Sequence, residues 1–407
     1  MDRSASLSKL NIVAIFAVFA GFAEFVILSP ALNALQLQFP NESFTTIMLA
    51  NTISGVVSVP VAIFVGATAN KVGYRPYAIL AYIFMIAGCY PFFLTEITVY
   101  WPIILSRVLV GIGTGLLFPI AGALVMYYFE GKKRAIMLGV SVVVQYVFAM
   151  TYTQVSGILA SIAWNYTFLT YLISVIPLVL IIAGLKESKH EIAESERKEK
   201  EQYAGIGKKK IDNRIWIFVV LGFMVANLVI SINFLSSLIV EQRGIGNAAA
   251  AGTMGTFFNA GCLCAGLLYG MIVNKIGKWA MPLFAAIGAI GSIWAYFTGS
   301  VVGLYIAAFM VGITDMMLFT SCQNCVGNLT HPTRLAFTNG IMSIMLNFGS
   351  FTGSYFLTAC QVGFPQLGMA APLMISGIIF AILAVIFLFM KFKPLTTKMY
   401  EGATEEE

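Results

Sequence analysis

The stretch Gly66–Gly73 reads G-A-T-A-N-K-V-G, and about half a chain length later Gly270–Gly277 reads G-M-I-V-N-K-I-G. Each copy ends a long apolar segment and precedes another, so both occupy the same place in their half of the sequence. A weaker echo follows, because V-G-I occurs at Val110–Ile112 and again at Val311–Ile313 with nearly the same separation. Self-similarity at a fixed period indicates a duplicated structural unit. The sequence therefore predicts two equivalent halves.

Composition indicates that the solvent around most of the chain is lipid. The 407 residues are 59% hydrophobic and 10% charged, against roughly 25% charged residues in soluble domains. One chain of this length cannot bury so much apolar surface in water, because single cores stop growing at about 250 to 300 residues. Helices of about 20 residues cross a hydrocarbon core of about 30 Å. We expect an all-α membrane protein with twelve transmembrane helices, near residues 11–35, 45–68, 77–94, 102–128, 136–162, 167–185, 215–239, 249–272, 281–298, 303–327, 336–358 and 369–390.

The charges predict how the chain is oriented. If the N-terminus is cytoplasmic, the 24 lysines and arginines all fall on the cytoplasmic side except Arg107, inside a segment, and Arg243, in an outer loop. The positive-inside rule therefore places both termini in the cytoplasm, for a multi-pass protein of the plasma (inner) membrane. The net charge of +6 reports this topology, and no nucleic-acid partner is expected.

The apolar segments fall into two groups of six. We expect an N-terminal six-helix bundle at 1–185, a cytoplasmic linker at 186–214, a C-terminal six-helix bundle at 215–390 and a cytoplasmic tail at 391–407. Lys, Glu and Gly replace the apolar run in the linker, which is typical of a solvated connection. The six cysteines lie in or beside apolar segments and read as small hydrophobic residues. Cys322 and Cys325 form a CxxC without a second ligand pair, so we expect neither a metal site nor a cofactor.

The repeated loop G-x-x-x-[DN]-[RK]-x-G, within two basic-looped halves, resembles the major facilitator superfamily over essentially the whole chain. Arg107 with Gly111 and Gly113 is similar to that family's R-x-x-x-G-x-G pattern. The resemblance implies two pseudo-symmetric bundles around a central cavity that opens alternately to either side, in a monomer. Two departures stand out. Asn70 occupies a position where the family usually has Asp, and Tyr152–Gly157 lacks the G-P-x-x-G-G of the family's proton antiporters.

Three charged residues lie within the predicted spans. Each costs about 2.5 to 3.5 kcal/mol on insertion scales, so a charge that remains there marks a candidate site. We hypothesise that Glu24 is the main proton-coupling or substrate-binding carboxylate and that Asp315 is the second. The alternative is that each carboxylate only holds helices together. Arg107 is shallow enough to snorkel to the surface, whereas the family pattern favours pairing with a carboxylate or an anionic substrate.

Neutral polar residues form stripes on several predicted helices, and together they indicate a wet cavity for a small organic solute. The alternative is interhelical hydrogen bonding, worth about 0.6 kcal/mol each. The predicted cavity-lining residues are Gln145, Tyr146, Tyr152, Asn227, Ser231, Asn259, Ser343, Asn347 and Tyr355.

The repeated loops are predicted to form a cytoplasmic gate. Basic anchoring alone would explain the positive charge of these loops but not the repeated glycine spacing. The predicted gate residues are Gly66, Asn70, Lys71, Gly73, Arg75, Gly270, Asn274, Lys275, Gly277, Arg134 and Arg334.

These patterns together predict a secondary active transporter that moves a small organic solute by alternating access, driven by a gradient of protons or of another ion. The alternative within transport is an efflux proton antiporter for drugs or metabolites. A non-transporting receptor or a membrane-embedded enzyme is the alternative from another class. The only two histidines are His190 and His331, and no convergent catalytic set is visible around them.

Overall fold

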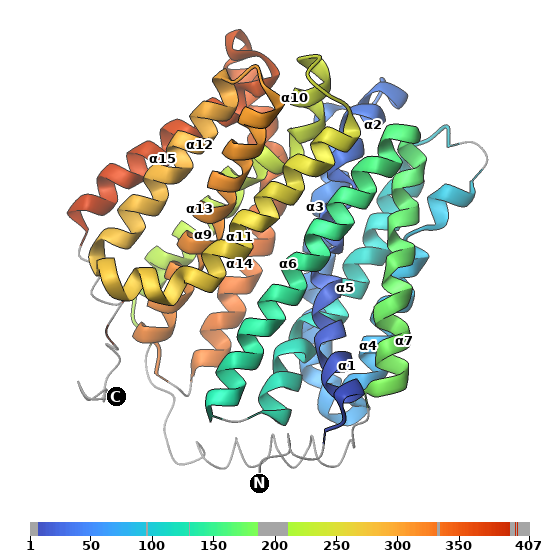
Figure 1. The fold of residues 1–407 in the computed structure, drawn as a ribbon, viewed down its shortest axis with the longest axis vertical. Helices are drawn as coiled ribbons and strands as arrows, with labels where there is room; N and C mark the ends of the chain where they lie inside the picture. Colours follow the sequence, from blue (N-terminus) through green and yellow to red (C-terminus); the bar gives the residue numbers. More distant parts are fainter. Residues whose placement is uncertain are drawn as a thin grey trace. The chain divides into compact units, whose positions relative to one another are not determined.

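The computed structural model describes residues 7–94, 97–129, 131–185, 211–331 and 334–390, together with Leu395 and Thr397. These residues form helices and no strands (Figure 1). Most of the predicted linker 186–214, with His190, lies outside the described residues, as does the predicted tail 391–407 apart from those two residues.

The first half of the chain begins with a broken helix and continues with longer ones. Its elements are α1 (Lys9–Ala20), the 3₁₀ segments η2 (Gly21–Val26) and η3 (Ser29–Ala31), α2 (Leu32–Gln38), α3 (Phe44–Val72), α4 (Tyr74–Ala87), η4 (Tyr90–Phe93), α5 (Trp101–Tyr128), α6 (Gly131–Ile162), η5 (Trp164–Ser174) and α7 (Val175–Gly184).

The second half repeats this succession of long helices. Its elements are α9 (Ile215–Phe234), α10 (Ser236–Gln242), α11 (Ala248–Ile276), η6 (Gly277–Trp279), α12 (Ala280–Phe297), α13 (Val301–Leu329), α14 (Leu335–Gly363), η8 (Pro365–Ala370) and α15 (Ala371–Phe389).

The lengths of these helices suit a membrane protein. Among the described residues, 10 helical stretches are long and apolar enough to cross a bilayer. One of them, Ala248–Phe297, contains both α11 and α12, and α14 with its polar stripe is not among the 10. The all-helical prediction is confirmed, and the described helices are compatible with twelve spans. Large apolar side chains such as Phe389, 84% exposed, lie on the outer helix surfaces as lipid contact requires.

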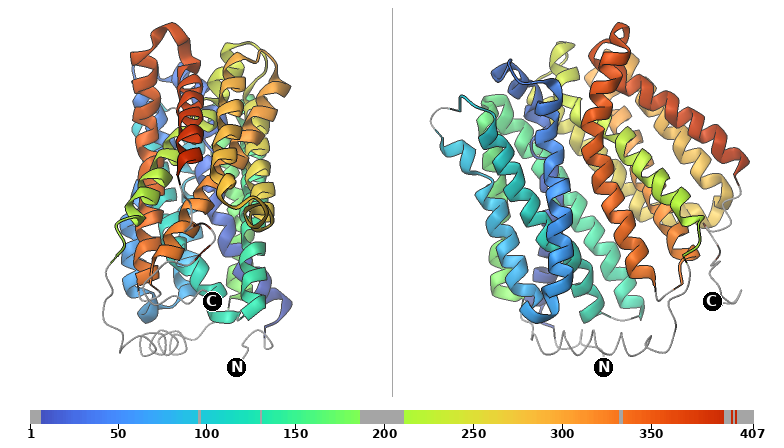
Figure 2. Two further views of the ribbon diagram at one scale, coloured as in Figure 1. Left: turned by 90° about the vertical axis from the view of Figure 1, so that its left-hand side faces the viewer. Right: turned by 180° about the vertical axis from the view of Figure 1, so that it is seen from behind.

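Packing divides the chain into two compact units. Unit 1 comprises Met1–Gln202 with Gly246–Thr256, and unit 2 comprises Tyr203–Ile245 with Phe257–Glu407. The short segment at the start of α11 groups with unit 1, where the Gln154 amide donates to Thr253 Oγ1 at 3.2 Å. In unit 1, α5 packs against both α3 and α4. In unit 2, α12 packs against α13 and α15 (Figure 2).

Glycines at the helix crossings explain the repeated V-G-I. A Cβ on Gly111 of α5 would lie 2.6 Å from the Ser54 carbonyl oxygen of α3, and one on Gly115 would lie 2.6 Å from that of Ser58. In unit 2, a Cβ on Gly312 of α13 would collide with the Phe258 carbonyl of α11. The absence of a side chain thus lets the corresponding helix pairs of both halves meet backbone to backbone.

We predict that Gly312→Ala destabilises the protein by about 1 to 3 kcal/mol, because the added methyl must push α11 and α13 apart. Gly327→Ala on the same helix is the matched control, since no described atom lies within 4 Å of a Cβ there. The control should gain about 0.5 to 1 kcal/mol from helix propensity. Unfolding in detergent, followed by circular dichroism, measures both changes. Equal effects of the two substitutions would contradict the packing role.

Candidate functional site

The first span is interrupted around Glu24. The sequence predicted one helix over 11–35, whereas the structure has the 3₁₀ segments η2 and η3 between α1 and α2. The Tyr82 hydroxyl donates to the Ala17 carbonyl at 2.6 Å, the carbonyl that would accept from the N–H of Gly21 in a regular α-helix. Pro30 has no N–H to bond back to Val26. Such mid-helix 3₁₀ segments often mark functional hinges, and Glu24 lies in one.

The Glu24 carboxyl group is fully buried and only half satisfied. Its Oε1 accepts a hydrogen bond from the Ser174 hydroxyl, and the Tyr152 hydroxyl lies 3.2 Å from Ser174 Oγ. Its Oε2 has no hydrogen-bond partner among the described residues. An unpartnered carboxylate oxygen is costly in an apolar interior. The group is therefore poised to take up a proton or to accept a bond from a ligand.

The segment η5 supplies two of the groups around this carboxyl. A 3₁₀ helix has three residues per turn, so Tyr171 and Ser174 lie on one face of it. In an α-helix the same two residues would differ by about 60° around the axis. The sequence predicted a helix over 167–185 and did not single out either residue. Their polar side chains inside an apolar run were the available signal.

Arg107 is fully buried as well. Its Nε donates to the Ala50 carbonyl oxygen at 2.9 Å, and its Nη1 donates to the Tyr171 hydroxyl. It also interacts electrostatically with Glu24. The snorkelling interpretation is therefore wrong: the side chain points into the bundle, where local partners satisfy it. We call Glu24, Arg107, Tyr152, Tyr171 and Ser174 the Glu24 cluster; all five lie in unit 1.

Asp315 has a different environment in unit 2. It lies on α13, partly buried, with Oδ2 4.0 Å from Cys262 Sγ of α11. The Cys262 thiol in turn lies 3.2 Å from the Gly312 carbonyl. A thiol is a weak donor, so the hydrogen bonding that Cys262 offers Asp315 is weaker than the one Ser174 offers Glu24.

The remaining predicted cavity residues are dispersed. The Asn227 amide oxygen accepts from Thr352 at 3.0 Å, Ser231 lies 3.0 Å from Ser376, and Asn347 donates to its own helix at Ser343 O, 2.9 Å away. The first two bonds match the interhelical alternative, whereas the third lies within α14. Of the others, Tyr152 is in the Glu24 cluster, Asn259 is buried, Gln145, Tyr146 and Ser343 are partly buried, and Tyr355 is half-exposed with its ring edge-on to Phe351.

The repeated loops contain glycines of two kinds. Gly73 and Gly277 have φ of 97° and 51°, a left-handed conformation that only glycine adopts easily. Around a Cβ placed on Gly66 or Gly270, no described atom lies within 4 Å. The turns after α3 and α11 explain Gly73 and Gly277. Packing within either unit does not explain Gly66 and Gly270.

Two of the basic gate residues bond to backbone carbonyls within unit 1. Arg75 donates to the Ile182 carbonyl at 2.8 Å, and Arg134 donates to Phe129 O at 2.9 Å. Lys71, Asn274 and Lys275 are exposed and Arg334 is partly buried, while the side chain of Asn70 lies outside the described part of the structure.

Comparison with known families gives the same assignment as the loop motif. The model of the Major Facilitator Superfamily matches residues 13–354 and 246–406. The chain belongs to this superfamily. Together with its membrane-spanning helices, membership indicates a multi-pass membrane transporter rather than an enzyme. A search of curated protein sequences found no significant match.

Solved transporters share the fold of this superfamily member. A crystal structure of a D-xylose-proton symporter has a TM-score of 0.69 at 16% identity, with 95% of this chain and 99% of that chain covered. A POT family transporter in complex with a thioalcohol-conjugated peptide has a TM-score of 0.69 at 13% identity, covering 95% and 96%. A POT family transporter in complex with 5-aminolevulinic acid has a TM-score of 0.68 at 13% identity, with 95% of this chain and 96% of that chain covered.

We predict that Ser174→Ala destabilises the protein by about 1 to 3 kcal/mol, because it removes the hydroxyl that donates to Glu24 and leaves a buried acceptor without that bond. Ser161→Ala is the matched control: this serine is exposed on α6 and bonds only its own helix, at Ile158 O. The measurement is chemical unfolding in detergent. An unchanged midpoint in Ser174→Ala would show that the hydrogen bond contributes nothing to stability.

Proposed function

We propose that this member of the Major Facilitator Superfamily is a secondary active transporter that moves a small organic solute by alternating access, with Glu24 as the proton-coupling carboxylate. The observation that carries the proposal is the Oε2 of a fully buried Glu24, which has no hydrogen-bond partner among the described residues and lies inside a broken helix. Asp315 is the second candidate for coupling or substrate contact.

Both protonation states of Glu24 find support in the Glu24 cluster. An ionised carboxylate in a dry interior needs an opposite charge nearby, and Arg107 interacts with it electrostatically. A neutral carboxyl group relieves the desolvation cost and can itself donate a hydrogen bond from the protonated oxygen. The proton and Arg107 thus compete for the same charge. That competition is what a carrier needs if it is to load and release protons in turn.

The break in the first span offers a way to connect protonation with movement. Glu24 lies in η2 and is bound to Ser174 of η5, while the Ser156 hydroxyl of α6 donates to the Ile27 carbonyl between η2 and η3. Around Glu24, 3₁₀ bonds such as Ile27 N–H to Glu24 O at 3.3 Å replace the regular α-helical ones, so a change in the bonding of Glu24 can shift the angle between α1 and α2. The D-xylose-proton symporter, which has a similar fold, supports the same type of coupling here.

The proposal extends to location and to the loops. We place the protein in the plasma (inner) membrane with both termini cytoplasmic, on the basis of its basic loops. Membership of the superfamily supports a monomer. The free space around Gly66 and Gly270 supports a cytoplasmic gate, since a repeated glycine without neighbours in this structure is suited to close contact in another conformation.

The decisive test is solute flux into proteoliposomes under an imposed pH gradient, with labelled organic acids, sugars and lipophilic cations as the panel. We expect Glu24→Gln to lose accumulation against the solute gradient by at least about tenfold while it retains solute exchange, because a neutral amide binds no coupling proton. Exchange in this variant should also lose its pH dependence. The matched control is Glu42→Gln, which changes an exposed carboxylate. Accumulation that persists in Glu24→Gln would refute the assignment of this residue.

The gate predicts a second phenotype. Gly66→Leu should reduce flux at least about tenfold without lowering the unfolding midpoint, because the side chain fits this structure but blocks the close approach of the other state. Gly363→Leu, at another position where a Cβ meets no described atom within 4 Å, should leave both quantities unchanged. Normal flux in Gly66→Leu would argue for simple anchoring by the basic loops.

A further inference from the structure

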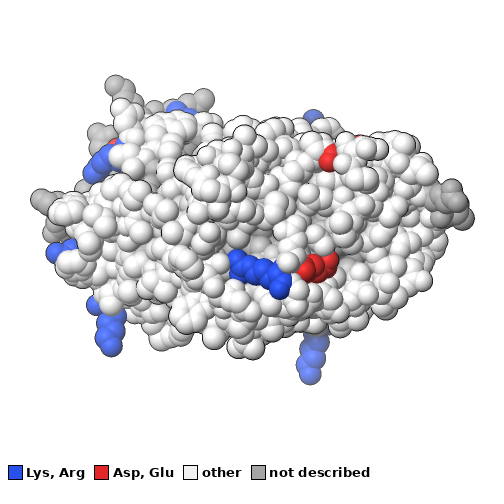
Figure 3. Space-filling model, turned by 90° about the horizontal axis from the view of Figure 1, so that it is seen from above, with Lys and Arg blue, Asp and Glu red and all other residues white. Residues whose placement is uncertain are grey.

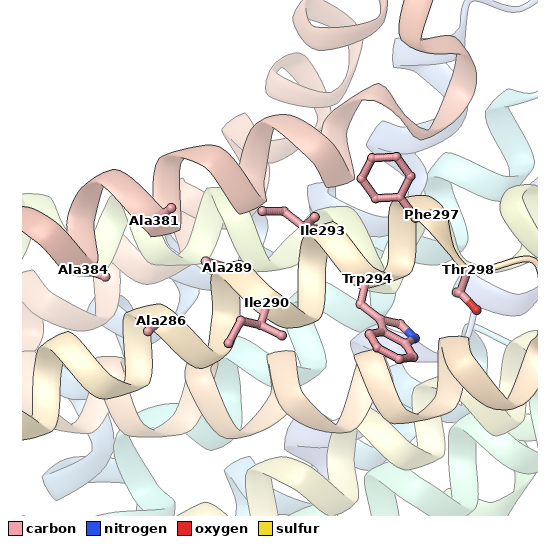
Figure 4. A pocket seen from close by; sticks show the side chains of 9 residues that line it. All are labelled: Ala286, Ala289, Ile290, Ile293, Trp294, Phe297, Thr298, Ala381 and Ala384. Carbon is pink, nitrogen blue, oxygen red and sulfur yellow. The ribbon is translucent and has the colours of Figure 1, made fainter.

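An apolar groove runs between α12 and α15 within unit 2 (Figure 4). Its volume is about 730 Å³. Small residues line it on both helices, namely Ala286 and Ala289 of α12 and Ala381 and Ala384 of α15. Trp294 and Phe297 lie toward its other end and are 52% and 69% exposed. The groove therefore opens to the surface through which this unit meets lipid.

The dimensions of the groove match one lipid chain. From Ala286 to Thr298 the helix rises about 18 Å at about 1.5 Å per residue. The hydrocarbon core is about 30 Å thick, so one leaflet contributes about 15 Å. The groove thus extends from near the middle of the membrane to one surface. Trp294 lies near that end, and tryptophan is enriched where hydrocarbon meets head groups.

Arg243 lies at the same end of the groove. Its guanidinium donates to the carbonyl oxygens of Ala295 at 3.0 Å, Tyr296 at 2.7 Å and Thr298 at 2.7 Å. Thr298 also lines the groove, so the positive charge is at its mouth. These bonds use both Nη1 hydrogens and one on Nη2. The Nε–H and the second hydrogen on Nη2 can still donate to a further acceptor. These two donors form the fork that suits a phosphate.

The transport function does not account for this arginine. Arg243 is the basic residue that the predicted topology leaves in an outer loop, and most of the surface seen in Figure 3 is uncharged. Capping the C-terminus of α12 explains a positive charge at this point. It does not explain why an open apolar groove of one-leaflet length begins there.

We propose that the α12–α15 groove binds one acyl chain of a phospholipid whose phosphate is held by Arg243. The apolar length, the interfacial Trp294 and the charge at the mouth each match one part of such a lipid. A second copy of the chain would fit the apolar surface but leaves the position of Arg243 unused. The site is separate from the Glu24 cluster and independent of the proposed coupling.

The test is native mass spectrometry of the intact protein with dioleoylphosphatidylglycerol, compared with dioleoylglycerol, which has the same chains and no phosphate. Wild type should retain one phosphatidylglycerol and at least about tenfold less dioleoylglycerol. Arg243→Gln should lower phosphatidylglycerol occupancy about tenfold. Arg243→Lys keeps the charge but not the fork and should lower occupancy less. Ala381→Phe should remove it by filling the groove. The matched controls are Arg214→Gln, an exposed arginine of unit 2, and Leu283→Phe, an exposed position on α12 that does not line the groove.

Three outcomes would overturn the site. Equal retention of the two lipids by wild type would remove the role of the phosphate, and this comparison needs no variant to fold. Unchanged phosphatidylglycerol occupancy in both Arg243→Gln and Ala381→Phe would exclude the groove. A dimer of the wild type that Ala381→Phe dissociates, with lipid occupancy unchanged, would assign the surface to self-association instead.

Discussion

The burial of two ionisable side chains, Glu24 and Arg107, inside unit 1 is the constraint to which the neighbouring structure conforms. Both side chains are fully buried, and neither charge tolerates a dry interior alone. Tyr171 and Ser174 lie on one face of the 3₁₀ segment η5. The Tyr171 hydroxyl accepts a hydrogen bond from Arg107, and the Ser174 hydroxyl donates one to Glu24 of η2. Irregular backbone is tolerated at membrane depth where protein groups surround it, and here it encloses the two charges.

Close helix contact elsewhere in unit 1 leaves room for this irregularity. Gly111 and Gly115 let α5 lie directly on the backbone of α3, and Arg107 projects from the same helix one turn before Gly111 toward the Ala50 carbonyl of α3. The position of the guanidinium is therefore set by a rigid crossing, while the position of the carboxylate is set by a helix that is already broken. A change in their interaction is expected to move the broken helix rather than α5, because the former has fewer regular hydrogen bonds to lose.

Sequence reasoning predicted the features that depend on composition and local spacing. The helices and the repeated loop and V-G-I motifs are readable from hydropathy and spacing. The structure adds the physical reason for the repeated glycines, which is close helix contact at Gly111 and Gly312 and a positive φ at Gly73 and Gly277. The break in the first span was missed, although Pro30 signals a disrupted helix near Val26. The other contribution, the Tyr82 hydroxyl on the Ala17 carbonyl, comes from a distant helix and could not be read from local sequence. The depth of Arg107 along its helix was clear, but depth alone does not say which side of the helix faces lipid. Ser174 was missed although its polar side chain stands out in an apolar run, because its partner Glu24 lies 150 residues away in the sequence.

The two halves retain their packing but differ in their chemistry. The V-G-I glycines have corresponding contacts in both units, on α5 with α3 and on α13 with α11. When the two V-G-I motifs are aligned, Arg107 corresponds to Ala308, which is buried. Asp315 corresponds to Thr114, whose hydroxyl donates to Gly111 O of its own helix at 3.1 Å. Duplication therefore preserved the helix crossings, which tolerate no side chain, while the charges diverged. Among the described residues at this register, the buried arginine of unit 1 therefore has no counterpart in unit 2, and the partly buried carboxylate of unit 2 has none in unit 1.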